Sequence, residues 1–143
     1  MNDTELYELC RKVYELTEWG KSRDLTDFYF NKRYVDEKIG FRYEIDHYSD
    51  VAREASHITL KLRNGLAVPL YTSDYLLEKL PGEFDNYYID LSWSGKKNGW
   101  FASYFTNDYT PDRPIEKYQC SAGTPLKALL ALVISLRISG VKL

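Results

Sequence analysis

The residues best suited to hold a ligand gather near the start of the apolar run "SAGTPLKALLALVISLR", residues 121–137. Thr124 is a typical N-cap and Pro125 a typical first helical residue. A helix start presents backbone N–H groups and the positive end of its dipole to an anion, and Pro125 leaves the next two N–H groups for this purpose. Gly123 allows close backbone approach. This turn is therefore a candidate anion site.

Aromatic, amide and cationic side chains precede this turn in the chain. They add stacking, hydrogen bonding and charge neutralisation, which together suit a nucleotide-like ligand. The candidate ligand-binding residues are Trp100, Phe101, Tyr104, Asn107, Arg113, Lys117, Gly123 and Thr124. The alternative is a capped core helix beneath an ordinary polar loop.

A second candidate surface combines arginine and tyrosine, which are enriched at interface hot spots. It consists of Arg33, Tyr34, Arg42 and Tyr43, in the segments "FNKRYV" and "GFRYE". The sequence predicts a partner interface here. The alternative is a set of edge-strand side chains that reach toward water.

Motifs for catalysis or metal binding are weak. His47 and His57 lie ten residues apart without a nearby Cys or His at ligand spacing. The segment "DHYSD", residues 46–50, holds Ser, His and Asp, but no G-x-S-x-G motif accompanies it. The turn "SGKKNG", residues 94–99, lacks the Walker pattern. We therefore expect no catalytic residue, no metal and no cofactor.

Composition is that of a globular protein. The 143 residues are 44% hydrophobic and 28% charged, which predicts a single domain over residues 1–143. The 19 basic and 21 acidic residues give a net charge of −2, so no basic face for duplex nucleic acid is expected. Thirteen tyrosines, three tryptophans and six phenylalanines indicate aromatic strands or a stacking surface.

The N-terminus has no signal-peptide pattern, and the apolar run is too short and too interrupted by Lys127, Ser135 and Arg137 to span a bilayer. Cys10 and Cys120 lack C-x-x-C spacing and are expected to be reduced thiols. These observations predict a cytoplasmic protein without a membrane partner.

Periodicity predicts helices at residues 2–19, 73–80 and from Thr124 onward, the first ending at Trp19-Gly20. Hairpins are expected at residues 57–71, with an Asn64-Gly65 turn and Pro69 at a sheet edge, and at residues 86–105. Residues 21–57 read as irregular strands or loops with a helical piece near 50–56, and residues 106–122 as a polar loop. The result is an α+β fold, an antiparallel sheet covered by helices, with the last helix against the sheet.

The order of "YTSDYLLEKLP" (71–81), "WFASYF" (100–105) and "SAGTPLKALLALVISL" (121–136) resembles the phage ABA sandwich domain family. The opening "LYELCRKVYELTEWG" is similar to the N-terminal helix of that family. The resemblance covers roughly residues 5–20 and 70–138, and it makes residues 21–69 an expected insertion. Gly123 stands where the family more often has Asp, which puts an Asp-dependent role in doubt.

The resemblance implies a helix–sheet–helix sandwich of phage or prophage origin, acting in the cytoplasm of an infected bacterial host. The family has no agreed activity. From the phage setting and the candidate ligand residues, we expect a non-enzymatic accessory protein that counters host defence by sequestering a small nucleotide-derived immune signal, as Thoeris anti-defence proteins do. Such a sponge is expected to be a homo-oligomer. The alternatives are a protein-binding inhibitor of a host or defence enzyme, acting through residues 21–57, and a nucleotide hydrolase.

Overall fold

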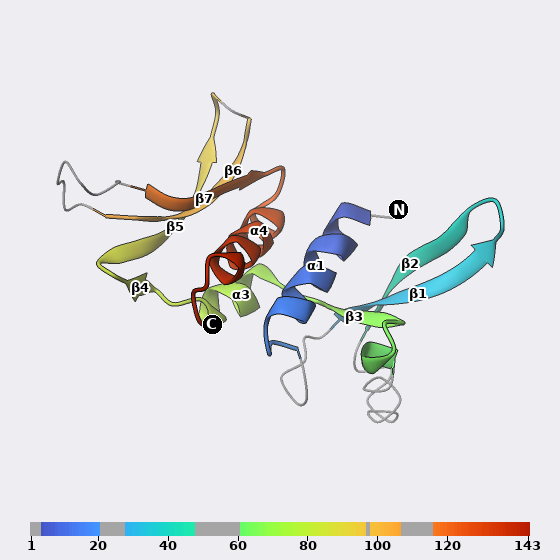
Figure 1. The fold of residues 1–143 in the computed structure, drawn as a ribbon. Coiled ribbons are helices and arrows are strands. Elements are labelled where there is room, and N and C mark those ends of the chain that lie inside the picture. The colour runs from blue at the N-terminus through green and yellow to red at the C-terminus, as the bar shows by residue number, and fades with distance from the viewer. Residues whose placement is uncertain (1–3, 21–27, 48–60, 97, 107–115) are drawn as a thin grey trace. The chain divides into compact units, whose positions relative to one another are not determined.

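The computed structural model describes residues 4–20, 28–47, 61–96, 98–106 and 116–143 (Figure 1). The fold is α+β, as predicted, and contains two antiparallel sheets. The chain divides into two compact units, Met1–Tyr71 and Thr72–Leu143. Each unit has its own sheet and its own helical cover, so each is described by itself.

The first unit packs helix α1 (Thr4–Leu16) on a sheet of three strands, β1 (Phe28–Asp36), β2 (Gly40–His47) and β3 (Ala67–Leu70). The strand order is β2-β1-β3. One stripe of α1, spaced by three residues, is buried: Tyr7, Cys10 and Val13. Tyr7 packs edge-on against Phe30 of β1, with ring centroids 5.7 Å apart.

The chain turns sharply after α1. Gly20 has φ +80°, a left-handed conformation that favours glycine, at the stop position that the sequence predicted. A Cβ at Gly20 would lie 2.8 Å from Cγ of the buried Pro69 on β3. The Tyr71 hydroxyl donates a hydrogen bond to the Trp19 carbonyl at 2.7 Å. These contacts tie the end of α1 to β3.

The predicted hairpin over residues 57–71 is wrong. Residues 61–63 are helical, and the Asn64-Gly65 turn leads from that helical piece into β3. β3 pairs with β1, far away in sequence, along Phe28–Asn31 of β1. The predicted edge position of Pro69 is confirmed, because β3 is the last strand in the order. Ile58, Leu60 and the predicted helix near 50–56 lie outside the described residues.

The segment from residue 28 to 47, expected to be irregular strands or loops, is an antiparallel hairpin of β1 and β2 with one register shift, between Tyr34 and Asp36. Its turn is closed by Asp36, whose Oδ1 accepts hydrogen bonds from the N–H groups of Lys38 and Ile39. β3 pairs only with the first part of β1, so β1 and β2 continue beyond it as a two-stranded arm. We call residues 32–43 the arm.

The second unit packs helices α3 (Ser73–Lys79) and α4 (Pro125–Ile138) with a four-stranded sheet. The strands, in the order β4-β5-β6-β7, are β4 (Glu83–Phe84), β5 (Tyr87–Ser94), β6 (Gly99–Phe105) and β7 (Glu116–Ala122). The predicted hairpin of β5 and β6 is confirmed, with Trp93 opposite Trp100. α4 contacts β6, β7 and α3, as expected for the last helix (Figure 1).

The apolar run at residues 125–138 forms α4, capped by Thr124 with Pro125 in its first turn, as predicted. Its inner residues are completely buried: Ala128, Leu129, Leu130, Leu132, Val133 and Leu136. Burial on most of its circumference explains why the helix is so apolar. Among the described residues, no helix combines the length and apolar character that crossing a membrane requires.

The end of the predicted loop 106–122 is instead strand β7. It pairs with β6 from Trp100↔Ala122 to Phe105↔Glu116, and its register shifts between Ala102 and Tyr104. This bulge adds one residue to β7, and Tyr118 within it has φ +57°. The strand was not predicted because its side chains are mostly polar and alternate only in part.

Candidate functional site

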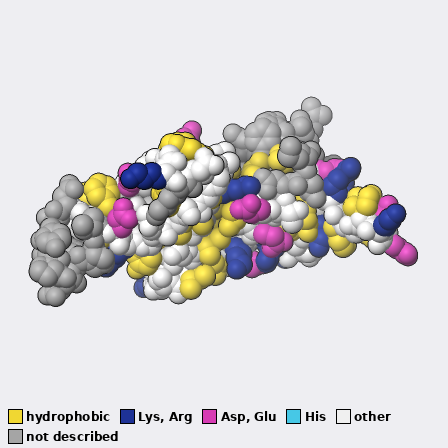
Figure 2. Space-filling view, turned by 90° about the horizontal axis from the view of Figure 1, so that it is seen from above, with side chains coloured by type: hydrophobic (Ala, Val, Ile, Leu, Met, Phe, Trp, Pro, Cys, Tyr) yellow, Lys and Arg dark blue, Asp and Glu magenta, His cyan; other side chains and the backbone are white. Residues whose placement is uncertain are grey.

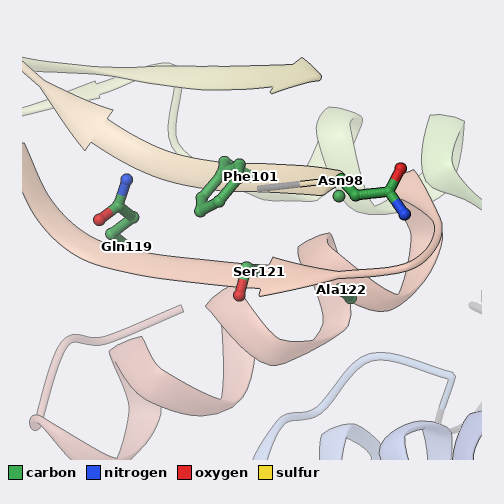
Figure 3. Close-up of a pocket in the computed structure, with 6 residues that line it drawn as sticks. Asn98, Phe101, Gln119, Ser121 and Ala122 are labelled. Atoms are coloured by element: carbon green, nitrogen blue, oxygen red, sulfur yellow. The ribbon is translucent and has the colours of Figure 1, made fainter. Parts of the chain in front are cut away.

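A hollow of the second unit lies along strands β6 and β7. It has a volume of about 360 Å³ and is lined by Asn98, Gly99, Phe101, Gln119, Ser121 and Ala122. Figure 3 shows the Phe101 ring between the side chains of Gln119 and Asn98. A smaller hollow of about 150 Å³ adjoins it, sharing Phe101 and Gln119. Phe101 is therefore the centre of one continuous surface, which we call the Phe101 hollow.

Strand alternation divides the predicted ligand residues between two faces. Phe101 lines the hollow. Trp100 and Tyr104 lie one and three residues from Phe101 on the same strand, so their side chains point to the opposite face. Tyr104 is completely buried and donates a hydrogen bond from its hydroxyl to the Pro81 carbonyl at 2.7 Å. Lys117 pairs with Tyr104, and its Nζ lies 4.7 Å from the ring centroid of buried Tyr87. These three side chains therefore support the sheet from the other side.

The start of α4 is more self-contained than the sequence suggested. The Thr124 hydroxyl oxygen accepts a hydrogen bond from the Lys127 N–H at 3.2 Å. Pro125 itself has no N–H to donate. Of the next two N–H groups, which the sequence analysis expected to be available for an anion, the one of Lys127 therefore already has a partner. A Cβ at Gly123 would meet nothing within 4 Å, so glycine is not required there for packing. Asn107 and Arg113 lie outside the described residues.

Polar residues that the sequence analysis did not select line the Phe101 hollow. On β5, Asp90, Ser92 and Ser94 alternate with the apolar residues of the opposite face, and all three line the smaller hollow. Ser103 and Glu116 complete it. The period-two pattern of "IDLSWS" carried the signal for β5, whereas Gln119 and Ser121 were missed because their segment was read as a loop.

The described lining of the Phe101 hollow is neutral to acidic. The larger part has amide and hydroxyl groups around the Phe101 ring, and the smaller part adds the carboxylates of Asp90 and Glu116. The Ser92 hydroxyl donates to Asp90 Oδ2 at 3.2 Å. No lysine or arginine is among these described lining residues. The surface therefore suits a planar ring with hydroxyl or amide groups better than a phosphate.

A separate hollow of about 230 Å³ lies in the first unit, between α1 and the residues around β3. Its lining includes Tyr14, Arg11 and Arg63. Arg11 is already held by two carboxylates of α1, with Glu8 at 2.8 Å and Glu15 at 2.5 Å. An anionic ligand would compete with both carboxylates, which leaves Arg63 as the more accessible cation of this hollow.

The arm carries the second predicted surface, and it has two different faces. Tyr34 and Phe41 pair directly and pack edge-on, with ring centroids 5.7 Å apart. Tyr43 lies on the same face and stacks on Tyr7 of α1 at 3.7 Å. Arg33 and Arg42 oppose each other on the other face. The four predicted interface residues thus lie together on the arm, with tyrosines and arginines on opposite sides.

Glu44 balances the two opposed arginines. Its Oε2 lies 2.9 Å from Arg33 Nε, and its Oε1 lies 2.6 Å from an Arg42 nitrogen. The hydrogen bond from Arg42, aided by the charge of Arg33, lowers the pKa of the Glu44 carboxyl. Figure 2 shows hydrophobic, basic and acidic side chains interspersed over the arm, at the right-hand end of the view.

Comparison with protein-family models, with curated proteins and with solved structures finds no match to this chain. The resemblance to phage sandwich domains therefore stays an expectation from short motifs.

Nucleophilic chemistry has little support in the described residues. Burial raises the pKa of the Cys120 thiol, although a hydrogen bond with Ser135 opposes this, so Cys120 is mainly the unreactive thiol at neutral pH. No group of three His, Cys, Asp or Glu side chains in the described ranges could hold a metal ion. The segment "DHYSD" continues outside the described residues, so its predicted lack of a catalytic role stays a prediction.

Tyr104 should make stability depend on pH in the alkaline range. Burial raises its pKa from 10 to about 12, so its neutral form is favoured in the folded state. This stability is fully present below pH 10 and is lost as the pH rises toward 12, by on the order of 2–3 kcal/mol.

Urea unfolding of wild type and Tyr104→Phe at pH 8 to 11.5 measures this effect. The variant is expected to lose less stability than wild type over that range. Tyr88→Phe, which removes an exposed hydroxyl from β5 and leaves Tyr104 in place, is the matched control. Parallel pH curves for wild type and Tyr104→Phe would contradict the assignment.

Proposed function

We propose that this protein is a non-enzymatic binding protein that sequesters a small nucleotide-derived signal, with the base and sugar of the ligand at the Phe101 hollow. The observation that carries this proposal is a half-exposed aromatic ring flanked by two amide side chains and a hydroxyl, on an open sheet face. Base stacking on an aromatic ring and hydrogen bonds to amides are the usual means of holding a nucleoside.

The charges of the lining residues indicate where each part of the ligand would lie. Asp90 and Glu116 would repel phosphate, and no described lining residue supplies a cation. The proposal therefore places any phosphate outside the smaller hollow, toward solvent. It follows that a nucleoside should bind about as tightly as its monophosphate, which is not expected of a site built from arginines.

Calorimetry with adenosine, AMP and cyclic ADP-ribose as probes tests this proposal. Replacing Phe101 by Ala should weaken binding by roughly 5- to 150-fold, the range that corresponds to the loss of one stacking contact. Two control variants should keep wild-type affinity. Trp93→Ala removes an exposed aromatic ring from the opposite face of the same hairpin, and Arg63→Ala removes the cation of the other hollow.

Two results would contradict the proposal. One is the absence of binding to all three probes together with the absence of any small molecule in protein purified from a bacterial lysate. The other is a loss of binding in Arg63→Ala while Phe101→Ala binds normally, which would move the site to the first unit. Recovery of hydrolysed ligand after heat denaturation would favour the hydrolase alternative.

The setting of this function is proposed from the motif resemblance alone. It is that of a phage-encoded protein that sequesters the signal in the host cytoplasm. The same resemblance implies a helix–sheet–helix sandwich in one domain over residues 1–143. Residues 21–69 would then be an elaboration of that domain, although they include strands β1 and β2 and the start of β3.

A second candidate function is inhibition of a host or defence enzyme through the arm. It is favoured by the exposed apolar residues there: Tyr34, Val35, Ile39 and Phe41. Exposed aromatic residues beside arginines are common at protein interfaces. A stoichiometric protein partner that is lost in a Tyr34→Ala/Phe41→Ala variant, with no bound small molecule, would favour this function over the first.

A further inference from the structure

We propose that the outer edge of β2 pairs with β2 of a second copy of this chain, antiparallel, with the two-fold axis passing between Tyr43 and its copy. This pairing involves neither the Phe101 hollow nor a ligand. The partner is a second copy because the residue pattern of β2 is self-complementary.

The backbone of β2 is oriented for such a pairing. The Lys32 N–H bonds to the Leu66 carbonyl at 2.9 Å, so the polar backbone groups of Lys32 point toward β3 and away from β2. Lys32 pairs with Tyr43, and that pair is therefore one without mutual hydrogen bonds. In a strand, alternate residues direct their backbone groups to the same side. The N–H and C=O groups of Phe41 and Ile45, two residues before and after Tyr43, therefore point to the outer edge of β2.

β2 is also the more suitable of the two sheet edges. In the described strands the order is β2-β1-β3, so β2 and β3 are the edges. β3 contains Pro69, which has no N–H to donate and is a common means of blocking edge pairing. β2 is eight residues long and has no proline.

The charges on β2 select a second copy in one register. With the axis at Tyr43, Arg42 faces Glu44 of the second copy, and Glu44 faces its Arg42. Two opposite-charge pairs form at positions without backbone hydrogen bonds, where side chains approach most closely. A register shifted by two residues would place Arg42 or Glu44 opposite its own copy, which is unfavourable.

The apolar face of β2 matches in the same register. Phe41 and Ile45, which are 48% and 52% exposed, face each other across the axis. Aromatic–β-branched pairs are favourable cross-strand neighbours. Backbone pairing, two charge pairs and two apolar pairs therefore coincide in one arrangement, and the two three-stranded sheets would join into one of six strands.

Sedimentation velocity of the full chain over a concentration series tests the proposal. We expect a reversible dimer for wild type. Ile45→Pro removes an N–H that points away from β1, so it should raise the dimer dissociation constant at least tenfold while circular dichroism shows a folded protein. Ile45→Val, which keeps the N–H and the β-branched side chain, should stay within threefold of wild type.

Reversal of the charges tests the register. Arg42→Glu places acids opposite each other across the axis and should weaken the dimer at least tenfold. Adding Glu44→Arg restores both pairs in reverse, and Arg33 keeps a carboxylate directly opposite it at position 42. The double variant should return to within threefold of wild type, and this rescue holds even if Ile45→Pro does not fold.

Three results would overturn the proposal. One is a monomer at every concentration. Another is a dimer that is insensitive to both Ile45→Pro and Arg42→Glu. The third is a double variant as weak as Arg42→Glu alone. A different protein captured by a monomeric wild-type chain would assign the arm to the inhibitor function instead.

Discussion

Leu132→Ala should lower the free energy of unfolding by about 2–5 kcal/mol, the range for removing a large buried aliphatic side chain. Leu132 is completely buried in the middle of α4, the helix that packs against β6, β7 and α3. The loss combines transfer of the missing groups with a cavity that the surrounding residues fill only in part. Chemical unfolding followed by tryptophan fluorescence and circular dichroism measures the change.

Ile138→Ala is the matched control for that experiment. Ile138 is also an aliphatic residue of α4, but it is 71% exposed at the last position of the helix. Its replacement should change stability by less than about 0.5 kcal/mol. Equal losses in the two variants would mean that burial of Leu132 does not account for its contribution, because alanine has the higher helix propensity at both positions.

Gly20→Ala is expected to destabilise the first unit by on the order of 3 kcal/mol, from two causes acting together. A left-handed conformation costs a non-glycine residue roughly 1–2 kcal/mol. The added Cβ would also lie 2.8 Å from Pro69 Cγ and 3.1 Å from the Tyr71 hydroxyl oxygen. Overpacking of this kind costs about 1–3 kcal/mol, and it would disturb the Tyr71–Trp19 hydrogen bond.

Gly65→Ala separates the two causes. Gly65 has φ +72°, close to the value at Gly20, but a Cβ there would meet nothing within 4 Å. It should therefore cost only the conformational term, about 1–2 kcal/mol. Thermal unfolding of both variants gives the comparison, and a Gly20→Ala loss no larger than that of Gly65→Ala would show that Pro69 moves aside freely.

Elements whose signals are local were predictable from sequence. Thr124 and Pro125 mark the start of α4, Thr72 caps α3, and the alternation on both sides of Gly95–Gly99 marks β5 and β6. In each case the capping group, turn or partner strand lies within a few residues of the element that it defines. Such elements need no knowledge of the rest of the fold.

Strands whose identity depends on tertiary partners, and not on a local pattern, were missed. β3 joins β1, about 40 residues earlier, although Asn64-Gly65 suggested a nearby partner for it. β7 is polar on much of its length, so its identity as a strand depends on β6 and α4. Local patterns do not specify which of several partners a strand will choose, because that choice depends on packing of the whole unit.

The candidate site was predictable only in part for the same reason. Phe101 lines the hollow, but Trp100 and Tyr104 were grouped with it by proximity in sequence, and a strand sends neighbours to opposite faces. Gln119 and Ser121 required β7 to be recognised first. On the arm, by contrast, Arg33 and Arg42 meet as a cross-strand pair, because a regular hairpin brings two such segments together.

The β-bulge at Tyr118 determines which charged side chain lies on the face of the Phe101 hollow. If the same residues of β7 alternated regularly, without a bulge, Lys117 would lie on the face of Phe101 and Ser121, and Glu116 on the face of Tyr104. With it, Glu116 borders the recess beside Phe101, while the Lys117 ammonium sits over Tyr87 on the reverse side. The bulged backbone therefore places an anion, and not a cation, on the open face. Main-chain geometry thus decides which charge faces Phe101, because the same side chains on an unbulged strand would place the lysine there.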